Sequence, residues 1–163
     1  MGVAPDGREH DTGEPVKGVE KTARSIAISA HRDQVDKAGR PYIEHVTRVA
    51  RSCASECCRV VGWLHDVIED GHLSAADLHR MGIPPLLVGD VLVLTRRRGQ
   101  AYTDYIKSIV ASGSGVALIV KRADLKDNLR PGVTLDLERR YLSALGEIET
   151  AIEVLASTIR VQP

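Results

Sequence analysis

The sequence predicts an all-α fold, a single helical bundle of about seven to eight helices. Apolar residues recur at spacings of three and four along most of the chain, which is the period of an amphipathic helix. Glycine and proline fall between these runs and mark where they end. Residues 116–120 alone could form a buried strand, but no second segment offers a partner strand for them.

The length of 163 residues corresponds to about one domain. Residues 1–18 contain four glycines and two prolines and show no apolar period, so we expect a flexible N-terminal tail there. Residues 19–163 form the predicted domain. Phe is absent and aromatic residues make up only 3% of the chain, so the core must be built from Val, Leu, Ile and Ala.

In the first half of the domain, apolar residues spaced three and four apart and one proline predict three helices. A helical pattern starts at Val19 and stops before the polar loop 36–41. Pro41 is well placed at the start of a second helix, because its fixed backbone angle suits the first turn. A third helix is expected over 56–69, through an apolar stripe that leads into charged residues.

Helices in the second half each start at a cap or after a break. Ser74 and Asp77 resemble a capping box, and glycines at 113 and 115 interrupt the pattern. The segment 121–128 favours helix over strand. These helices are expected at 74–82, 84–94, 102–109, 116–129 and 136–159.

Charge and cysteine usage exclude several classes of protein. Lys+Arg and Asp+Glu both number 22, so the chain lacks the basic footprint of a nucleic-acid binder. It also lacks a polybasic segment and an apolar run of about 18 residues, so no membrane partner is expected. Cys53, Cys57 and Cys58 are a poor disulfide framework, which favours core packing of the thiols and a reducing cytoplasmic location.

Chemistry-bearing residues concentrate in residues 65–70, His-Asp-Val-Ile-Glu-Asp. A solvated charge run at a helix end is the simplest alternative, but His65 lies inside the apolar part of the pattern. His45 falls on another apolar face, and Asp124 follows a strongly apolar run, where a buried carboxylate needs a partner or a metal. His45, His65, Asp66 and Asp124 together offer two imidazoles and two carboxylates, a set that suits manganese, iron or zinc.

The order of these residues resembles the H…HD…D signature of the HD-domain metal-dependent phosphohydrolases. The likeness is greatest to the alarmone hydrolase domain of the RelA/SpoT type, and it extends over about residues 23–128. The matching segments are 30–34, 39–45, 49–50, 64–70, 94–95 and 121–124, with Asn128. Several motifs in order are far more specific than a lone His-Asp pair.

The resemblance implies a role for each residue type. It implies one divalent ion, usually manganese, with iron, zinc or magnesium as alternatives, and an acidic pair that handles the attacking water. The metal ligands would be His45, His65, Asp66 and Asp124. The acidic pair would be Glu69 and Asp70. The nucleotide pocket would be lined by Lys37, Tyr42, Lys121 and Asn128.

The function implied is a nucleotide phosphohydrolase that resembles guanosine 3′,5′-bis(diphosphate) 3′-pyrophosphohydrolases. One departure stands at Asp36, where the alarmone hydrolases carry an arginine that packs on the guanine base. Asp36 offers no such cation, which keeps hydrolysis of another nucleotide open. A non-catalytic, metal-holding nucleotide sensor is a further alternative, although it would not need Glu69 and Asp70. The chain contains no Walker loop, which disfavours kinase chemistry.

Overall fold

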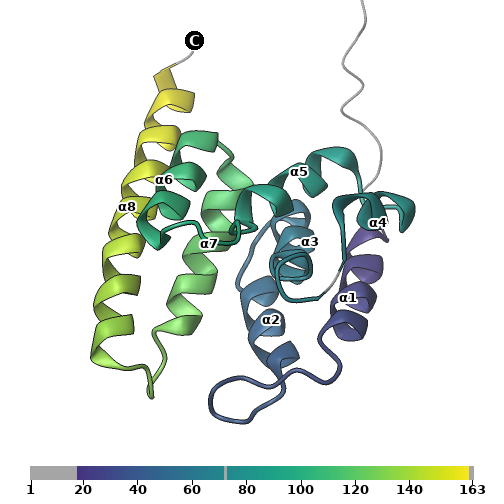
Figure 1. The fold of residues 1–163 in the computed structure, drawn as a ribbon. Helices are drawn as coiled ribbons and strands as arrows, with labels where there is room; N and C mark the ends of the chain where they lie inside the picture. Colours follow the sequence, from purple (N-terminus) through teal and green to yellow (C-terminus); the bar gives the residue numbers. More distant parts are fainter. Residues whose placement is uncertain (1–17, 72, 162–163) are drawn as a thin grey trace, which may run out of the picture.

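A computed structural model describes residues 18–71 and 73–161 (Figure 1). Over these residues the chain forms eight α-helices and no strand, apart from an isolated bridge between Val35 and Pro41. The all-α prediction is confirmed, whereas the predicted tail, residues 1–18, lies outside the described part except for Gly18. The helices are α1 (Val19–Ala30), α2 (Tyr42–Arg51), α3 (Glu56–Leu64), α4 (Ala75–Arg80), α5 (Pro85–Leu94), α6 (Tyr102–Ser112), α7 (Gly115–Asn128) and α8 (Leu135–Val161).

The helices form two groups that meet along α3 and α7. Figure 1 shows α1, α2 and α3 together on one side and α6, α7 and α8 together on the other. α1 and α2 both pack against α3, α8 packs against α7, and α3 contacts α7. Among the described residues, the buried apolar side chains are aliphatic except for Cys53, Cys58, Trp63 and Tyr105, in line with the absence of Phe. The functional site lies where α2, α3 and α7 converge.

Local signals in the sequence start several of these helices. The hydroxyl of Ser55 accepts a hydrogen bond from the backbone of α3, and Ser114 does the same for α7. Ser74 and Asp77 form a capping box at α4, as predicted. Gly113 ends α6 with φ of 66°, a left-handed conformation that favours glycine. The ambiguous segment 116–129 is helical, because Ser114 caps it.

Gly62 lets α2 and α3 approach closely. A Cβ at this position would lie 2.9 Å from the Cα of Ala50, which is nearer than real Cβ contacts allow. Both residues are buried in the described structure. The missing side chain therefore fixes the distance between the helix that carries His45 and the helix that leads to His65.

The predicted third helix was wrong beyond Leu64. The structure ends α3 there and continues through residues 65–70 as successive turns. The Nδ1–H of His65 donates to the Gly62 carbonyl at 2.8 Å, and the amide of Val67 bonds to the Leu64 carbonyl. These bonds tighten the chain away from a regular helix. One helical turn remains within the segment, because the backbone N–H of Asp70 donates to the Asp66 carbonyl at 2.9 Å.

None of the helices in the described residues is both long enough and apolar enough to cross a bilayer.

Candidate metal centre

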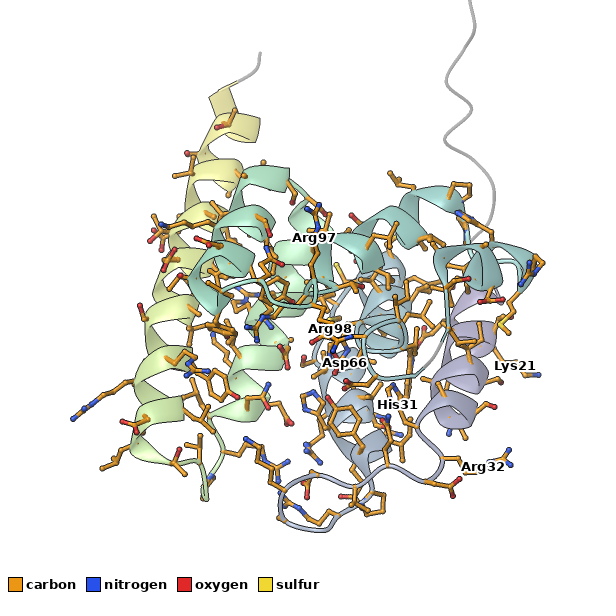
Figure 2. The ribbon with its side chains drawn as sticks, viewed as in Figure 1. Lys21, His31, Arg32, Asp66, Arg97 and Arg98 are labelled. Atoms are coloured by element: carbon orange, nitrogen blue, oxygen red, sulfur yellow. The ribbon has the colours of Figure 1, made fainter. Side chains whose placement is uncertain are left out.

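Three separate elements bring the predicted metal ligands together. His45 lies on α2, His65 is the cap of α3, and Asp124 lies on α7. One nitrogen of each histidine and one oxygen of Asp124 all lie within 4.8 Å of one another, and all three residues are buried. Figure 2 shows Asp66 in the middle of the molecule, with His31 on the side of α1. This His-His-Asp group could hold a metal ion.

Hydrogen bonds at Nδ1 orient both imidazoles. His45 Nδ1 lies 2.7 Å from Oδ2 of Asp127, and His65 Nδ1 lies 2.8 Å from the Gly62 carbonyl oxygen. Both partners are acceptors, so each Nδ1 carries a hydrogen. In the neutral imidazole, Nε2 is then the atom with a free lone pair. The two Nε2 atoms belong to the group that could bind the ion, which is what a metal site needs.

Asp66 lies beside the same group of donor atoms. Its Oδ2 is 2.9 Å from Nε2 of His65, yet that buried nitrogen makes no hydrogen bond to any described residue. The Tyr42 hydroxyl donates to the same Oδ2 at 2.6 Å. Two potential ligand atoms that approach without bonding fit a position that a cation would share. The residues present therefore fit the divalent ion that the sequence implies.

Two residues predicted to bind substrate contact Asp124 instead of only facing the pocket. Lys121 donates from Nζ to Oδ2 of Asp124 at 2.7 Å, and Asn128 donates from Nδ2 to Oδ1 at 2.6 Å. Burial opposes the ionisation of Asp124, but Lys121 and the two histidines outweigh it and hold the pKa of that carboxyl well below its usual range. Asp124 is thus ionised, as a metal ligand must be.

Charges within the group also change the titration of His65. Burial disfavours its charged form, but the carboxylates of Asp66 and Asp124 outweigh this and raise the pKa of His65 to about 9. Without a cation, the imidazolium therefore balances part of the negative charge of the carboxylates at neutral pH. A divalent ion would supply the same balance, and its binding would release that proton.

The acidic pair stands at the wall of the adjoining pocket. Glu69 accepts the backbone N–H of Arg96 at 2.9 Å, which holds its carboxylate in place. The backbone carbonyl of Asp70 accepts the amide of Gln34 at 2.8 Å. Desolvation raises the pKa of both side chains, with the Asp66 charge as a further cause. Both effects favour groups that can take up a proton.

A pocket of about 560 Å³ opens from the metal centre. It is lined by the predicted residues Lys37, Tyr42, Lys121 and Asn128 and by the acidic pair. All four tyrosines of the chain line it: Tyr42, Tyr102, Tyr105 and Tyr141. Cationic side chains lie over two of these rings: Arg96 and Arg140 over Tyr102, and Lys121 over Tyr105.

No protein-family model matches the sequence, and no curated protein matches it. Among solved structures, the chain is similar to a metazoan orthologue of SpoT, described as hydrolysing ppGpp and playing a role in starvation responses. The match has a TM-score of 0.65 and 21% sequence identity, and it covers 89% of this chain and 97% of that chain.

The chain has the helical-bundle fold of an HD domain. At 21% identity the likeness extends to the fold, and the chemistry of the site rests on the residues described above.

Asp36 lines the pocket and is also tied into its own loop. Its carboxylate accepts the backbone N–H groups of Ala38 and Arg40 at 2.8 and 3.0 Å, so it closes its own loop. It also pairs with the Arg40 guanidinium at 3.1 Å. Arg40 is half exposed and lines the pocket. A cation therefore stands at this rim after all, four residues further along the chain.

Asp127 is a site residue that the sequence reasoning missed. It orients His45, and its carboxylate also accepts Nε and a terminal nitrogen of Arg48 at 2.7 and 3.0 Å. The tyrosines beyond Tyr42 were missed as well, because in the sequence they belong to ordinary amphipathic helices. Arg96 also lines the pocket; it belongs to a run of three arginines for which the sequence favours a solvated loop over a role in steering phosphates. The one available signal for Asp127 was its position three residues after Asp124 on a helix.

Proposed function

We propose that the protein is a metal-dependent phosphohydrolase that acts on a nucleotide. One observation carries the proposal: a nitrogen of each of His45 and His65 and an oxygen of Asp124 lie within 4.8 Å of one another, and His45 and Asp124 line the pocket together with Glu69 and Asp70, whose pKa values are raised. His45, His65, Asp66 and Asp124 would hold the ion. Bound there, a divalent ion lowers the pKa of water and offsets phosphate charge.

Side chains around the ion would transfer the proton, orient the attacking water and hold the metal ligands in place. Glu69, fixed by the Arg96 amide, can accept a proton at its free carboxylate oxygen, and Asp70 can orient the attacking water. Tyr42 holds Asp66 through its hydroxyl, while Lys121 and Asn128 hold Asp124. These bonds keep the ligand carboxylates in place while substrate enters and product leaves.

The favoured substrate is ppGpp, which would lose its 3′ pyrophosphate. The motif pattern of the sequence and the fold shared with a ppGpp hydrolase support it. The pocket volume suits a nucleotide, and Arg96, Arg140 and Lys121, which lie over tyrosine rings in it, add positive charge for the phosphates. Manganese is the expected metal because the resemblance to the alarmone hydrolases implies it, while imidazole nitrogens with carboxylate oxygens also suit iron or zinc.

A screen of phosphate and pyrophosphate release over a panel of nucleotides tests this proposal, with manganese at saturation. The panel contains ppGpp, pppGpp and the common nucleoside mono-, di- and triphosphates. We expect ppGpp to give the highest kcat/KM, with pyrophosphate and GDP as products. A His65→Ala variant serves as the inactive control. Equal, background-level release by both proteins for every nucleotide would refute the hydrolase assignment and favour a nucleotide sensor.

Hydrolysis of a different nucleotide is the second candidate. The loop that carries Asp36 favours it, because its cation lies on Arg40 rather than at position 36 and would meet a ligand from a different direction. In the same screen, a nucleotide other than ppGpp with the highest kcat/KM would support this candidate.

A further inference from the structure

A second cleft lies between α2 and α7, on the other side of Asp127 from the metal centre. Its volume is about 430 Å³. We call it the basic cleft and define it by the residues that line it: Arg48, Ser52, Ile119, Arg122, Ala123, Lys126, Asp127 and Arg130. Four of these side chains are cationic and one is anionic, in a chain whose total charge is zero. Ile119 and Ala123 add apolar surface to its wall.

The single carboxylate of the basic cleft is already neutralised. Asp127 accepts hydrogen bonds from Arg48 and His45, and Arg130 lies 3.6 Å from it. Lys126 pairs with Glu149 at 2.9 Å, but both side chains are about half exposed, so this pair exchanges readily with water. The cleft consequently keeps a positive excess.

Arg122 is the clearest candidate for binding a ligand. It is partly buried, and among the described residues no hydrogen bond or ion pair engages its guanidinium, although it is near enough to Glu149 to help Lys126 lower the pKa of that carboxyl. A guanidinium offers five N–H donors in a planar fork, and phosphate oxygens match that geometry in pairs. Arg122 and Lys126 lie four residues apart on α7, so they project on the same face of the helix.

We propose that the basic cleft binds a diphosphate group at a site distinct from the active-site pocket. Arg122 and Lys126 would supply the direct contacts, and Arg48 and Arg130 would add charge from the cleft wall. The group could belong to free pyrophosphate or to a nucleoside diphosphate, since both present the same oxygens. This proposal does not depend on the hydrolase function, because neither Arg122 nor Lys126 lines the active-site pocket.

An anion bound in the basic cleft would affect the metal centre through Asp127. Arg48, Asp127 and Arg130 line both cavities. An anion that draws the two arginines toward itself leaves Asp127 with His45 as its main partner, and Asp127 is the acceptor that orients His45. Any such coupling is reciprocal, so metal binding would alter anion affinity by the same factor.

Binding of inorganic pyrophosphate to the full chain tests the site, measured by calorimetry in metal-free buffer. We expect R122A/K126A to lose one site or to bind about tenfold more weakly, because it lacks two charge-assisted contacts. The matched control is K107A/R139A, which removes the same charge from exposed positions on α6 and α8. The control should bind like wild type. Melting curves would show that both variants are folded.

Two outcomes would overturn the proposal. One is equal pyrophosphate binding by wild type and R122A/K126A, and the other is equal weakening in the control variant, which would indicate net charge alone. A parallel titration with GDP distinguishes the sources of the diphosphate group. Tighter binding of GDP than of pyrophosphate at the site that R122A/K126A removes identifies a nucleotide, and the reverse order identifies the free anion.

Discussion

Asp66 and Glu69 are three residues apart, but their different surroundings predict different roles for the two carboxylates. The Asp66 carboxylate lies against His65 and accepts the Tyr42 hydroxyl, beside the group formed by His45, His65 and Asp124. Glu69 lies at the pocket wall, where the Arg96 amide fixes one of its oxygens. A substitution at each position should therefore produce a different defect.

The Asp66→Asn variant should bind manganese more weakly, because an amide lacks the ligand charge. The Glu69→Gln variant should retain the metal but lose turnover by roughly 10²–10⁴-fold, the usual contribution of general acid–base catalysis. Metal content after dialysis and kcat on ppGpp measure the two effects separately. Equal loss of metal in both variants would show that Glu69 is itself a ligand.

The Asp36–Arg40 pair gives a second prediction at this scale. Because Asp36 closes its own loop, Asp36→Arg alone should disturb that loop and raise the KM for the nucleotide. Exchanging the charges in D36R/R40E restores an ion pair and should bring KM back toward the wild-type value. Michaelis curves for wild type and both variants measure this. If Asp36→Arg by itself lowers KM, the side chain at position 36 faces the base.

Close contact of two helices depends on a single missing side chain. Gly62→Ala should destabilise the protein by about 1–3 kcal/mol, since its Cβ would meet the backbone of Ala50. Gly89→Ala on α5 is the matched control, because no atom lies within 4 Å of its new Cβ. It should stabilise the protein by about 0.5–1 kcal/mol. Urea unfolding of both variants measures the difference, and equal effects would contradict the close approach.

Most helices could be predicted because their signals are local. Ser74, Gly113 and Ser114 act on backbone groups within a few residues, so the sequence alone shows them. The end of α3 could not be predicted, because a side chain of His65 takes the Gly62 carbonyl that a regular helix would use.

The candidate site also depends on contacts between residues far apart in the sequence, which local patterns do not reveal. The positions of His45, His65 and Asp124 could be recognised from motif order, which is a property of the sequence. The role of Asp127 could not, because its partner Arg48 is 79 residues away and meets it only when α2 packs on α7. Only the tertiary structure brings such partners together.

The whole molecule should depend on its metal for stability. The candidate ligands come from α2, the end of α3 and α7, so one ion would tie both helix groups together. Binding to the native state alone should stabilise it by about 2.7 kcal/mol at a hundredfold excess over Kd, or roughly 5–10 °C in Tm. Chelator should remove this increment and manganese should restore it.

A thermal melt of wild type and His65→Ala, each with chelator and with manganese, checks that expectation. The variant should show no response to either addition, because it lacks one ligand. A wild-type curve that stays unchanged, after metal analysis has shown that the chelator removed the ion, would mean that the ion contributes nothing to the fold.

Tyrosine and tryptophan lie in different parts of the molecule, so spectroscopy can follow the two parts separately. All four tyrosines line the active-site pocket, whereas Trp63, the single tryptophan, is buried in α3 beneath the Arg24 guanidinium. Ultraviolet difference spectra of tyrosine would therefore report events in the pocket. Fluorescence excited at wavelengths that only tryptophan absorbs would report the packing of α1 on α3. The chain therefore carries two kinds of native chromophore: tyrosines that report ligand binding in the pocket, and one tryptophan that reports packing in the core.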